Sequence, residues 1–359
     1  MKYLNALNLI DGVGSAKIKI LLDCFSSGEN IWKASFSDLS QSGIGEKLSA
    51  IIETKRKEID PDVEFEKLKK ENIRILDISN PDYPELLKEI HNPPQLLYVK
   101  GKKFSFNEKP MLAIVGSRKI TPYGQQVAMS LARDLAQAGI MIVSGMALGV
   151  DAIAHHACLS AGEKTIAILG SGLDDKNIGP TANFTLSRRI LEQGALVSDY
   201  PLGISAGIGT FPARNRIMAG MTIGTLVIEA AEKSGTLITA NLALEFNREV
   251  FAVPGPIFSP TSTGANNLIK AGAKPVSSAR DILEELNLEK RLAAQEVRKI
   301  IPSSPEEKII LEILSKETLH IDKIIKLSRM KTGSAISTLS IMEIKGMVKN
   351  IGGQNYILM

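Results

Sequence analysis

Glycine, serine and arginine residues follow several apolar segments of the chain, where they could bind phosphate. Glycine lets a ligand approach the backbone, hydroxyl groups and helix N-termini donate hydrogen bonds, and a guanidinium group can hold an oxyanion through two bonds. These residue types together are typical of a site for nucleotide phosphates. The runs are Gly116-Ser117-Arg118, Ser144-Gly145, Gly170-Ser171-Gly172 and Ser234-Gly235-Thr236.

A further run, Phe211-Pro212-Ala213-Arg214-Asn215-Arg216, adds an aromatic ring and two guanidinium groups. A nucleotide needs charge for its phosphate and a flat surface for its base, and stacking on a ring contributes about 1–3 kcal/mol per base with little dependence on sequence. Two alternatives stay open. Phe211 could instead pack into the core before a helix, and one of the two arginines could form a salt bridge, because residues two apart on a helix point in different directions.

Short apolar segments that alternate with helical stretches must position these residues. This alternation predicts an α/β fold, a doubly wound, extended Rossmann-like parallel sheet that is buried on both faces. Such a sheet binds ligands beyond the carboxyl ends of its strands, so we expect the runs above to share one edge. Strands are expected at 112–115, 141–143, 165–169, 195–197, 225–228 and 250–253, within a core domain that spans 61–288.

Other polar residues near this edge offer weaker candidates. Asp151 is expected to cap the helix that begins there, with general-base chemistry as the alternative. His155 and His156 are adjacent, so they cannot share a metal ion as residues four apart can, and no third ligand is evident. We therefore expect no metal, no cofactor and no catalytic residue. Glu229 could order an arginine or bind a sugar hydroxyl, and its role stays open.

The first sixty residues contain a repeated glycine hairpin between apolar helical patterns, which resembles tandem helix-hairpin-helix units in an all-helical, SAM-like domain (1–60). Each hairpin could present backbone amides and a helix N-terminus to a phosphate. The alternatives are a plain glycine-capped turn and a surface for protein contacts. The possible phosphate contacts are Gly12, Gly14, Gly43 and Gly45.

The C-terminal region has a polar stretch at 289–304, expected to be a linker, followed by three helical patterns and a hairpin at 305–359. This order predicts a winged-helix domain. Its third helix would begin near Lys331, Thr332, Ser334 and Ser337, and that helix is the usual recognition element for DNA. Winged helices also bind proteins, so the domain could bind either DNA or a protein, and both interpretations stay open.

Bulk composition indicates a globular protein of two or three domains, with 44% hydrophobic residues and a net charge of only +4. Nucleic-acid contact would therefore depend on where lysine and arginine are placed. Cys24 and Cys158 fit no metal or redox spacing. No segment is typical of a signal peptide or a membrane helix, so we expect a cytoplasmic protein without membrane contact.

Six motifs in order resemble the DNA-processing A family, DprA, also called Smf, from about residue 80 to 275. Each motif alone is weak, but their succession is specific. The helical N-terminal region and the winged-helix tail also fit that family's three-domain layout. The motifs are AIVGSR (113–118), SGMALGVD (144–151), FPARNR (211–216), SGTLITA (234–240), VPG (253–255) and GANNLI (264–269).

The resemblance implies a homodimer that binds single-stranded DNA, protects it during natural transformation and loads the RecA recombinase onto it past single-strand-binding protein. The family's strand-binding pocket carries over onto the residues Ser117, Arg118, Phe211, Arg214 and Arg216, lined by Gly116, Ser144, Gly145 and Gly170. The chain departs from the family pattern in places. It has Leu148 for a usual arginine, Glu163 for a glycine, and 177–180 where a Tyr-Pro pair is usual, so the rim of the pocket differs in detail.

The main alternative is a nucleotide-cleaving enzyme, because the same sheet resembles LOG-type phosphoribohydrolases. Those enzymes place a catalytic glutamate three residues after the threonine of a Gly-Thr turn. Here Gly235-Thr236 is followed at that position by Thr239. Without the carboxylate the glycosidic chemistry lacks its acid or base, so we expect a binding protein rather than an enzyme.

Overall fold

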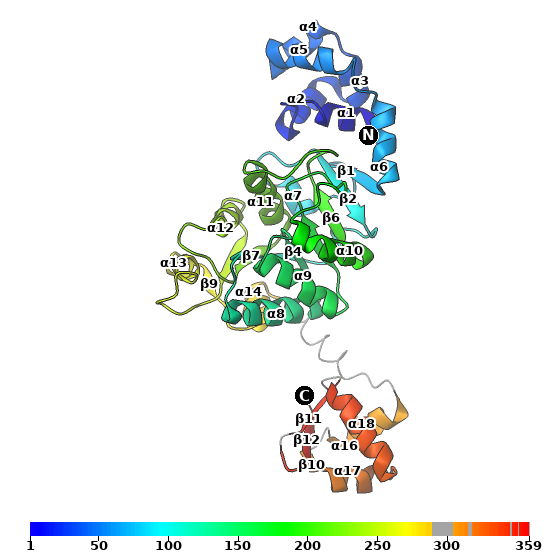
Figure 1. Ribbon diagram of the computed structural model, residues 1–359, viewed down its shortest axis with the longest axis vertical. Helices are drawn as coiled ribbons and strands as arrows, with labels where there is room; N and C mark the ends of the chain where they lie inside the picture. The colour runs from blue at the N-terminus through cyan, green and yellow to red at the C-terminus, as the bar shows by residue number, and fades with distance from the viewer. Residues whose placement is uncertain (289–303, 315–317, 345–346, 351, 359) are drawn as a thin grey trace. The chain divides into compact units, whose positions relative to one another are not determined.

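The computed structural model describes residues 1–288, 304–314, 318–344, 347–350 and 352–358. It divides into two compact units, Met1–Ile282 and Leu283–Met359. The first unit holds the helical head and the large sheet, and the second holds the C-terminal domain (Figure 1). The expected linker falls almost entirely outside the described residues.

A nine-stranded sheet forms the centre of the first unit, in the order β1-β2-β6-β5-β4-β3-β7-β8-β9. Strands β3 to β9 run parallel, which confirms the doubly wound fold, and all six expected strands are present within one or two residues of their predicted bounds. The parallel strands are β3 (Met111–Val115), β4 (Met141–Ser144), β5 (Thr165–Ile168), β6 (Ala195–Ser198), β7 (Gly224–Val227), β8 (Glu249–Ala252) and β9 (Lys274–Pro275).

Two further strands extend the sheet beyond β6. Strand β2 (Leu96–Gly101) pairs antiparallel with β6, and β1 (Ile73–Asp77) pairs antiparallel with β2. The prolines at 81–94 lie in the connection between these strands, not inside either of them. They therefore interrupt no ladder of hydrogen bonds.

Helices cover both faces of the sheet. Helices α8 and α9 pack against each other, and α11 and α12 form a second pair (Figure 1). The helices of this region are α7 (Glu85–Lys88), α8 (Pro122–Gln137), α9 (Val150–Ser160), α10 (Phe184–Gln193), α11 (Thr210–Met221), α12 (Thr236–Glu245), α13 (Thr263–Lys270) and α14 (Ala279–Glu285), with a short 3-10 turn at Thr181–Asn183.

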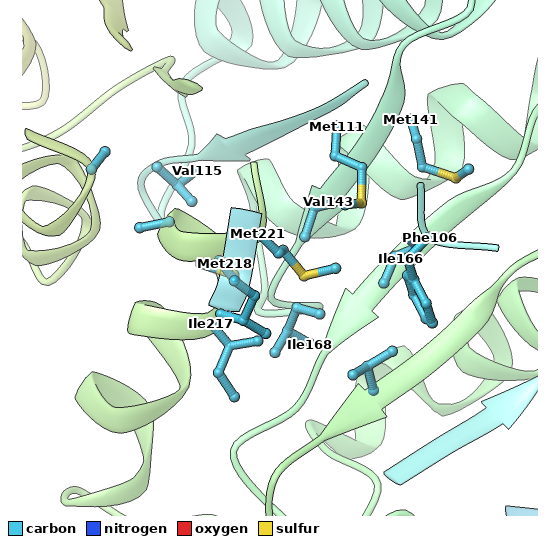
Figure 2. Close-up of a cluster of buried hydrophobic side chains, with 14 of the residues drawn as sticks. Phe106, Met111, Val115, Met141, Val143, Ile166, Ile168, Ile217, Met218 and Met221 are labelled. Carbon is cyan, nitrogen blue, oxygen red and sulfur yellow. The ribbon is translucent and has the colours of Figure 1, made fainter. Parts of the chain in front are cut away.

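The buried second half of α11 anchors that helix to the sheet. Ile217, Met218 and Met221 are at most 2% exposed and pack with Val143 and Ile168 of the central strands (Figure 2). Burial of a large aliphatic side chain contributes about 1.5–3 kcal/mol. The first turns of α11, which carry Phe211 and Arg214, are consequently held at the carboxyl ends of the strands.

The head consists of α1 (Lys2–Asn8), α2 (Ser15–Phe25), α3 (Gly28–Lys33), α4 (Phe36–Leu39), a π turn (Ser40–Ile44), α5 (Glu46–Lys55) and α6 (Pro61–Lys70). Its two glycine hairpins pack reciprocally. A Cβ atom at Gly12, in the first hairpin, would lie 3.3 Å from Leu48, which follows the second hairpin. A Cβ atom at Gly43, in the second hairpin, would lie 3.8 Å from Ile20, which follows the first. Both glycines have φ near +90°, a backbone conformation that favours glycine. Their contact with phosphate stays a prediction.

The head joins the sheet through polar and apolar contacts. The Tyr98 hydroxyl, on β2, donates a hydrogen bond to Asn5 (2.9 Å) and accepts one from Asn8 (3.1 Å). Leu96 of β2 belongs to the hydrophobic cluster of the head. The predicted boundary near residue 60 therefore separates two regions that share buried contacts.

The C-terminal unit has the winged-helix order that the sequence predicts. Helix α16 (Pro305–Leu314), β10 (Leu319–His320), α17 (Ile321–Ser328) and α18 (Thr332–Ile344) precede the hairpin of β11 (Val348–Asn350) and β12 (Asn355–Leu358). The strands pair in the order β10-β12-β11. Helix α18 contains no lysine or arginine, and its Ile336 and Ile341 are exposed. No helix in the described parts of the chain is long and apolar enough to cross a membrane.

Candidate nucleic-acid interface

A pocket of about 190 Å³ opens where strands β3, β4 and β5 end. Its walls come from the loops that follow these strands, from the loop between β6 and α11, and from the first turns of α11. This is the edge at which doubly wound sheets bind their ligands. The lining residues are Arg118, Gly145, Ala147, Leu148, Leu169, Gly170, Ser171, Gly179, Pro180, Ala206, Phe211 and Arg214.

Arg118 and Phe211 meet at this pocket. The Arg118 guanidinium lies 5.2 Å from the centre of the Phe211 ring, a distance typical of a cation–π contact. Arg118 is exposed and makes no ion pair or hydrogen bond within the described residues. Its N–H donors are therefore free to bind an oxyanion, beside an aromatic ring of the kind on which a base can stack.

Arg214 forms the deep side of the pocket. Only 5% of this residue is exposed, and its Nη1 donates a hydrogen bond to the carbonyl of Ile168 (2.7 Å). A Cβ atom at residue 145 would overlap the guanidinium, which explains why glycine stands there. Burial lowers the pKa of Arg214 from its ordinary value, and the nearby Asp151 opposes this effect.

Asp151 braces the loop between β4 and α9. Its carboxylate accepts hydrogen bonds from the backbone N–H groups of Gly145 (3.1 Å) and Ala147 (3.3 Å). The expectation that Asp151 caps its own helix is wrong, because the N-cap is Gly149, which has positive φ. Burial raises the pKa of Asp151, and Arg214 opposes that shift. Asp151 thus holds the loop that covers Arg214.

The outer wall of the pocket consists of two loops that hydrogen bonds tie together. Asp174 accepts a bond from the Gly203 N–H (2.9 Å), and the Ser205 hydroxyl donates to the Asn177 side chain (2.6 Å). These bonds connect the segment that ends in Gly179-Pro180 to the segment that contains Ala206. The 177–180 segment, which departs from the family pattern, is therefore part of the wall.

Five of the nine residues predicted for the strand-binding site line the pocket, and four do not. The Ser144 hydroxyl is buried and donates to Ile114, and the Ser117 hydroxyl donates to Lys119, so each is used inside the protein. Gly116 is needed because a Cβ atom there would overlap Val150. The lining residues among the nine are Arg118, Gly145, Gly170, Phe211 and Arg214.

Arg216 points to a different part of the molecule. Its Nη2 lies 2.7 Å from Asp199 Oδ2, and its Nη1 donates to the carbonyl of Asn92. This matches the alternative in which one of the two arginines forms a salt bridge. The Arg216 guanidinium therefore already has partners inside the protein. Its contact with a ligand stays a prediction.

Glu229 binds the start of α8 at the neighbouring part of the sheet edge. Strand order reverses between β3 and β7, which is where many doubly wound folds bind a nucleotide phosphate. Here Glu229, 2% exposed, accepts hydrogen bonds from the backbone N–H and the hydroxyl of Thr121, the N-cap of α8. A Cβ atom at Gly124 would overlap its carboxylate. The Glu229 side chain thus occupies the start of α8.

The run Ser234-Gly235-Thr236 also lies outside the pocket lining. The Ser234 hydroxyl accepts a hydrogen bond from the Thr236 N–H (3.2 Å) and donates one to the Thr236 hydroxyl (3.0 Å). These groups form a local turn before α12. Their contact with phosphate stays a prediction.

The apolar part of the pocket was not predicted from the sequence. It consists of small or aliphatic residues whose types predict no binding role: Ala147, Leu169 and Ala206. Only their positions, directly after a strand or in a glycine-rich loop, could have indicated that they line a pocket. No group of three metal-binding side chains exists in the described residues, and this includes the surroundings of the two adjacent histidines. His155 is buried, and burial lowers its pKa to about 3, so it is neutral.

Two family profiles match the chain. The profile described as DNA recombination-mediator protein A matches residues 74–287, and the profile of the DprA winged helix domain matches 294–354. The first match covers all but the first residue of the sheet, and it covers every pocket residue. The second covers most of the C-terminal unit.

Similar proteins align over much of the chain. Protein Smf of Synechocystis is 34% identical over 390 aligned positions, which cover 99% of this chain and 98% of that protein. The DNA processing protein DprA of Bacillus subtilis is 40% identical over 218 positions, which cover 61% of this chain and 73% of that protein.

Two solved structures share the fold at 31–34% identity. DNA processing protein A of Streptococcus pneumoniae matches with a TM-score of 0.68 and 34% identity, over 79% of this chain and 98% of that one. DNA processing protein A of Helicobacter pylori, whose structure concerns its single-stranded DNA binding mode, matches with a TM-score of 0.55 and 31% identity, over 60% of this chain and 96% of that one.

Proposed function

This chain belongs to the DNA recombination-mediator protein A family, DprA or Smf, and on that basis we propose that it binds single-stranded DNA at the pocket beyond strands β3 to β5. The observation that carries the proposal is the pairing of Arg118 with Phe211 at that pocket. The similar protein from Helicobacter pylori, whose structure concerns single-stranded DNA binding, supports the same class of ligand.

The two side chains suit the two parts of a nucleotide. Arg118 can donate two parallel hydrogen bonds to a backbone phosphate, and the Phe211 ring offers a surface for a base. In a duplex the bases are stacked and paired, so their faces cannot reach the ring. The pocket therefore favours a single strand over a duplex.

We further propose that the protein is not an enzyme. Thr239, which is buried, stands where the phosphoribohydrolase pattern needs a glutamate. Glu229 fills the start of α8, where a mononucleotide phosphate would otherwise bind. Both residues argue against the alternative of a nucleotide hydrolase.

The experiment that tests the function compares single- and double-stranded oligonucleotides of one sequence in gel-shift titrations. We expect the full-length protein to bind the single strand at least about tenfold more tightly, a difference of about 1.4 kcal/mol. Equal affinity for both forms would refute the proposal. A variant truncated after residue 288 should keep most of this preference, because the pocket belongs to the first unit.

The same protein at micromolar concentration serves as a control for the enzymatic alternative. Incubated with nucleoside monophosphates, it should release no free base above the rate without protein. Release that depends on protein concentration would instead support the hydrolase.

We propose, on the family resemblance, that the chain acts as a homodimer that loads RecA onto single strands past single-strand-binding protein, in natural transformation or recombination. Light scattering should then report twice the mass of one 38.8 kDa chain. The protein should also shorten the lag of RecA assembly on a strand coated with single-strand-binding protein. A monomeric mass would refute the homodimer, and an unchanged lag would refute the loading of RecA.

A further inference from the structure

Two large exposed aliphatic side chains belong to segments that form the pocket. Leu148, which lines the pocket, is 45% exposed, and Ile208 is 95% exposed. Ile208 lies in the sequence between two lining residues, Ala206 and Phe211. A single exposed aliphatic residue is ordinary on a protein surface, but two in the segments that form one pocket, together with the Phe211 ring, indicate a binding surface.

Hydrogen bonds hold the loop that carries Ile208 on both sides of that residue. The Gly172 N–H donates to the carbonyl of Ile204 (2.8 Å), and the Ser205 hydroxyl donates to Asn177. The next anchor is Thr210, whose hydroxyl bonds both the N–H and the carbonyl of Gly207. Ile208 projects between these fixed points, so its exposure is a property of an ordered loop.

Few charges accompany these side chains. Of the twelve residues that line the pocket, only Arg118 and Arg214 are charged, and Arg214 is buried and bonded to Ile168. The mouth thus offers one exposed guanidinium for a phosphate and a larger apolar surface. Phosphate oxygens gain nothing from aliphatic groups, whereas the faces of bases lose water when they pack against them.

We propose that Leu148 and Ile208 form, together with Phe211, an apolar rim that packs against the bases of the strand on either side of the pocket. The inference rests on the proposed function and deepens it: the strand is held more by its bases than by its phosphates. Phe211 stacks on one base, while the two aliphatic residues cover the faces of its neighbours.

The test compares two labelled probes of equal length by fluorescence anisotropy: oligo(dT), and a strand in which every base is replaced by an abasic tetrahydrofuran residue. The wild-type protein should bind oligo(dT) at least about tenfold more tightly. Ile208→Ser should weaken oligo(dT) binding about three- to tenfold, leave the abasic strand unchanged and leave the salt dependence unchanged. Leu148→Ser should act in the same direction.

The variant Ile257→Ser is the matched control, because Ile257 is 80% exposed in the loop after β8 and does not line the pocket. It should bind both probes as the wild type does. A second variant, Ile208→Lys, adds a cation instead. It should steepen the slope of log affinity against log salt by about 0.7, the value for one phosphate contact on a single strand. It should also reduce the difference in affinity between oligo(dT) and the abasic strand.

Equal affinity of the wild type for both probes would refute the proposal of an apolar rim and would leave the proposal of single-strand binding standing. So would an Ile208→Ser variant that weakens both probes alike or neither. Failure of the wild type to bind oligo(dT) at all would instead refute the proposed function, so the two failures are distinguishable.

Discussion

Arg118→Ala is expected to weaken single-stranded DNA binding about 10- to 100-fold, the loss of about 1.5–3 kcal/mol that removal of a hydrogen bond to a charged group produces. Arg118 is exposed, lies over the Phe211 ring and has no carboxylate partner within the described residues. Its guanidinium is therefore available to a phosphate. Because a phosphate carries no sequence information, the loss should be similar for strands of any sequence.

Salt dependence identifies the cause of that loss. Removing one phosphate contact should flatten the slope of log affinity against log salt by about 0.7. Arg133→Ala is the matched control, since Arg133 is an exposed arginine on α8 that pairs with Asp134 and does not line the pocket. Gel-shift titrations at several salt concentrations measure both quantities. An unchanged affinity and slope for Arg118→Ala would show that the strand binds elsewhere.

Gly145→Ala is expected to damage both the pocket and the fold around it. The added Cβ atom would overlap the Arg214 guanidinium, which is buried and bonded to Ile168. Overpacking of this kind costs about 1–3 kcal/mol of folding stability. Displacing the arginine also deforms the deep side of the pocket, so we expect single-strand affinity to fall at least about tenfold.

Thermal unfolding and gel-shift titration measure the two effects separately. The melting temperature should fall by about 2–4 °C for each kcal/mol lost. Arg133→Ala, an exposed position outside the pocket lining, serves here too as the control. It should change neither measurement. A Gly145→Ala protein with wild-type affinity would show that Arg214 does not shape the binding site.

The sequence alone predicted the doubly wound sheet, because continuous apolar strands that alternate with helices leave few other packings. It also predicted the edge of the sheet at which the pocket lies. Arg118, Gly145, Gly170 and Phe211 line the pocket as expected, since each follows a strand or begins the helix beside the strand ends.

Only the tertiary structure decided what each polar group at that edge does. Arg214 and Arg216 are two residues apart in one motif, yet one lies beneath Gly145 in the pocket and the other pairs with Asp199. Glu229 meets Thr121 across 108 positions of the chain, and Asp151 bonds the loop before its helix instead of capping it. Spacing along the chain determines which elements form, because backbone geometry is local. The partner of a side chain depends on which distant segments packing brings within about 3 Å of it, the range of a hydrogen bond.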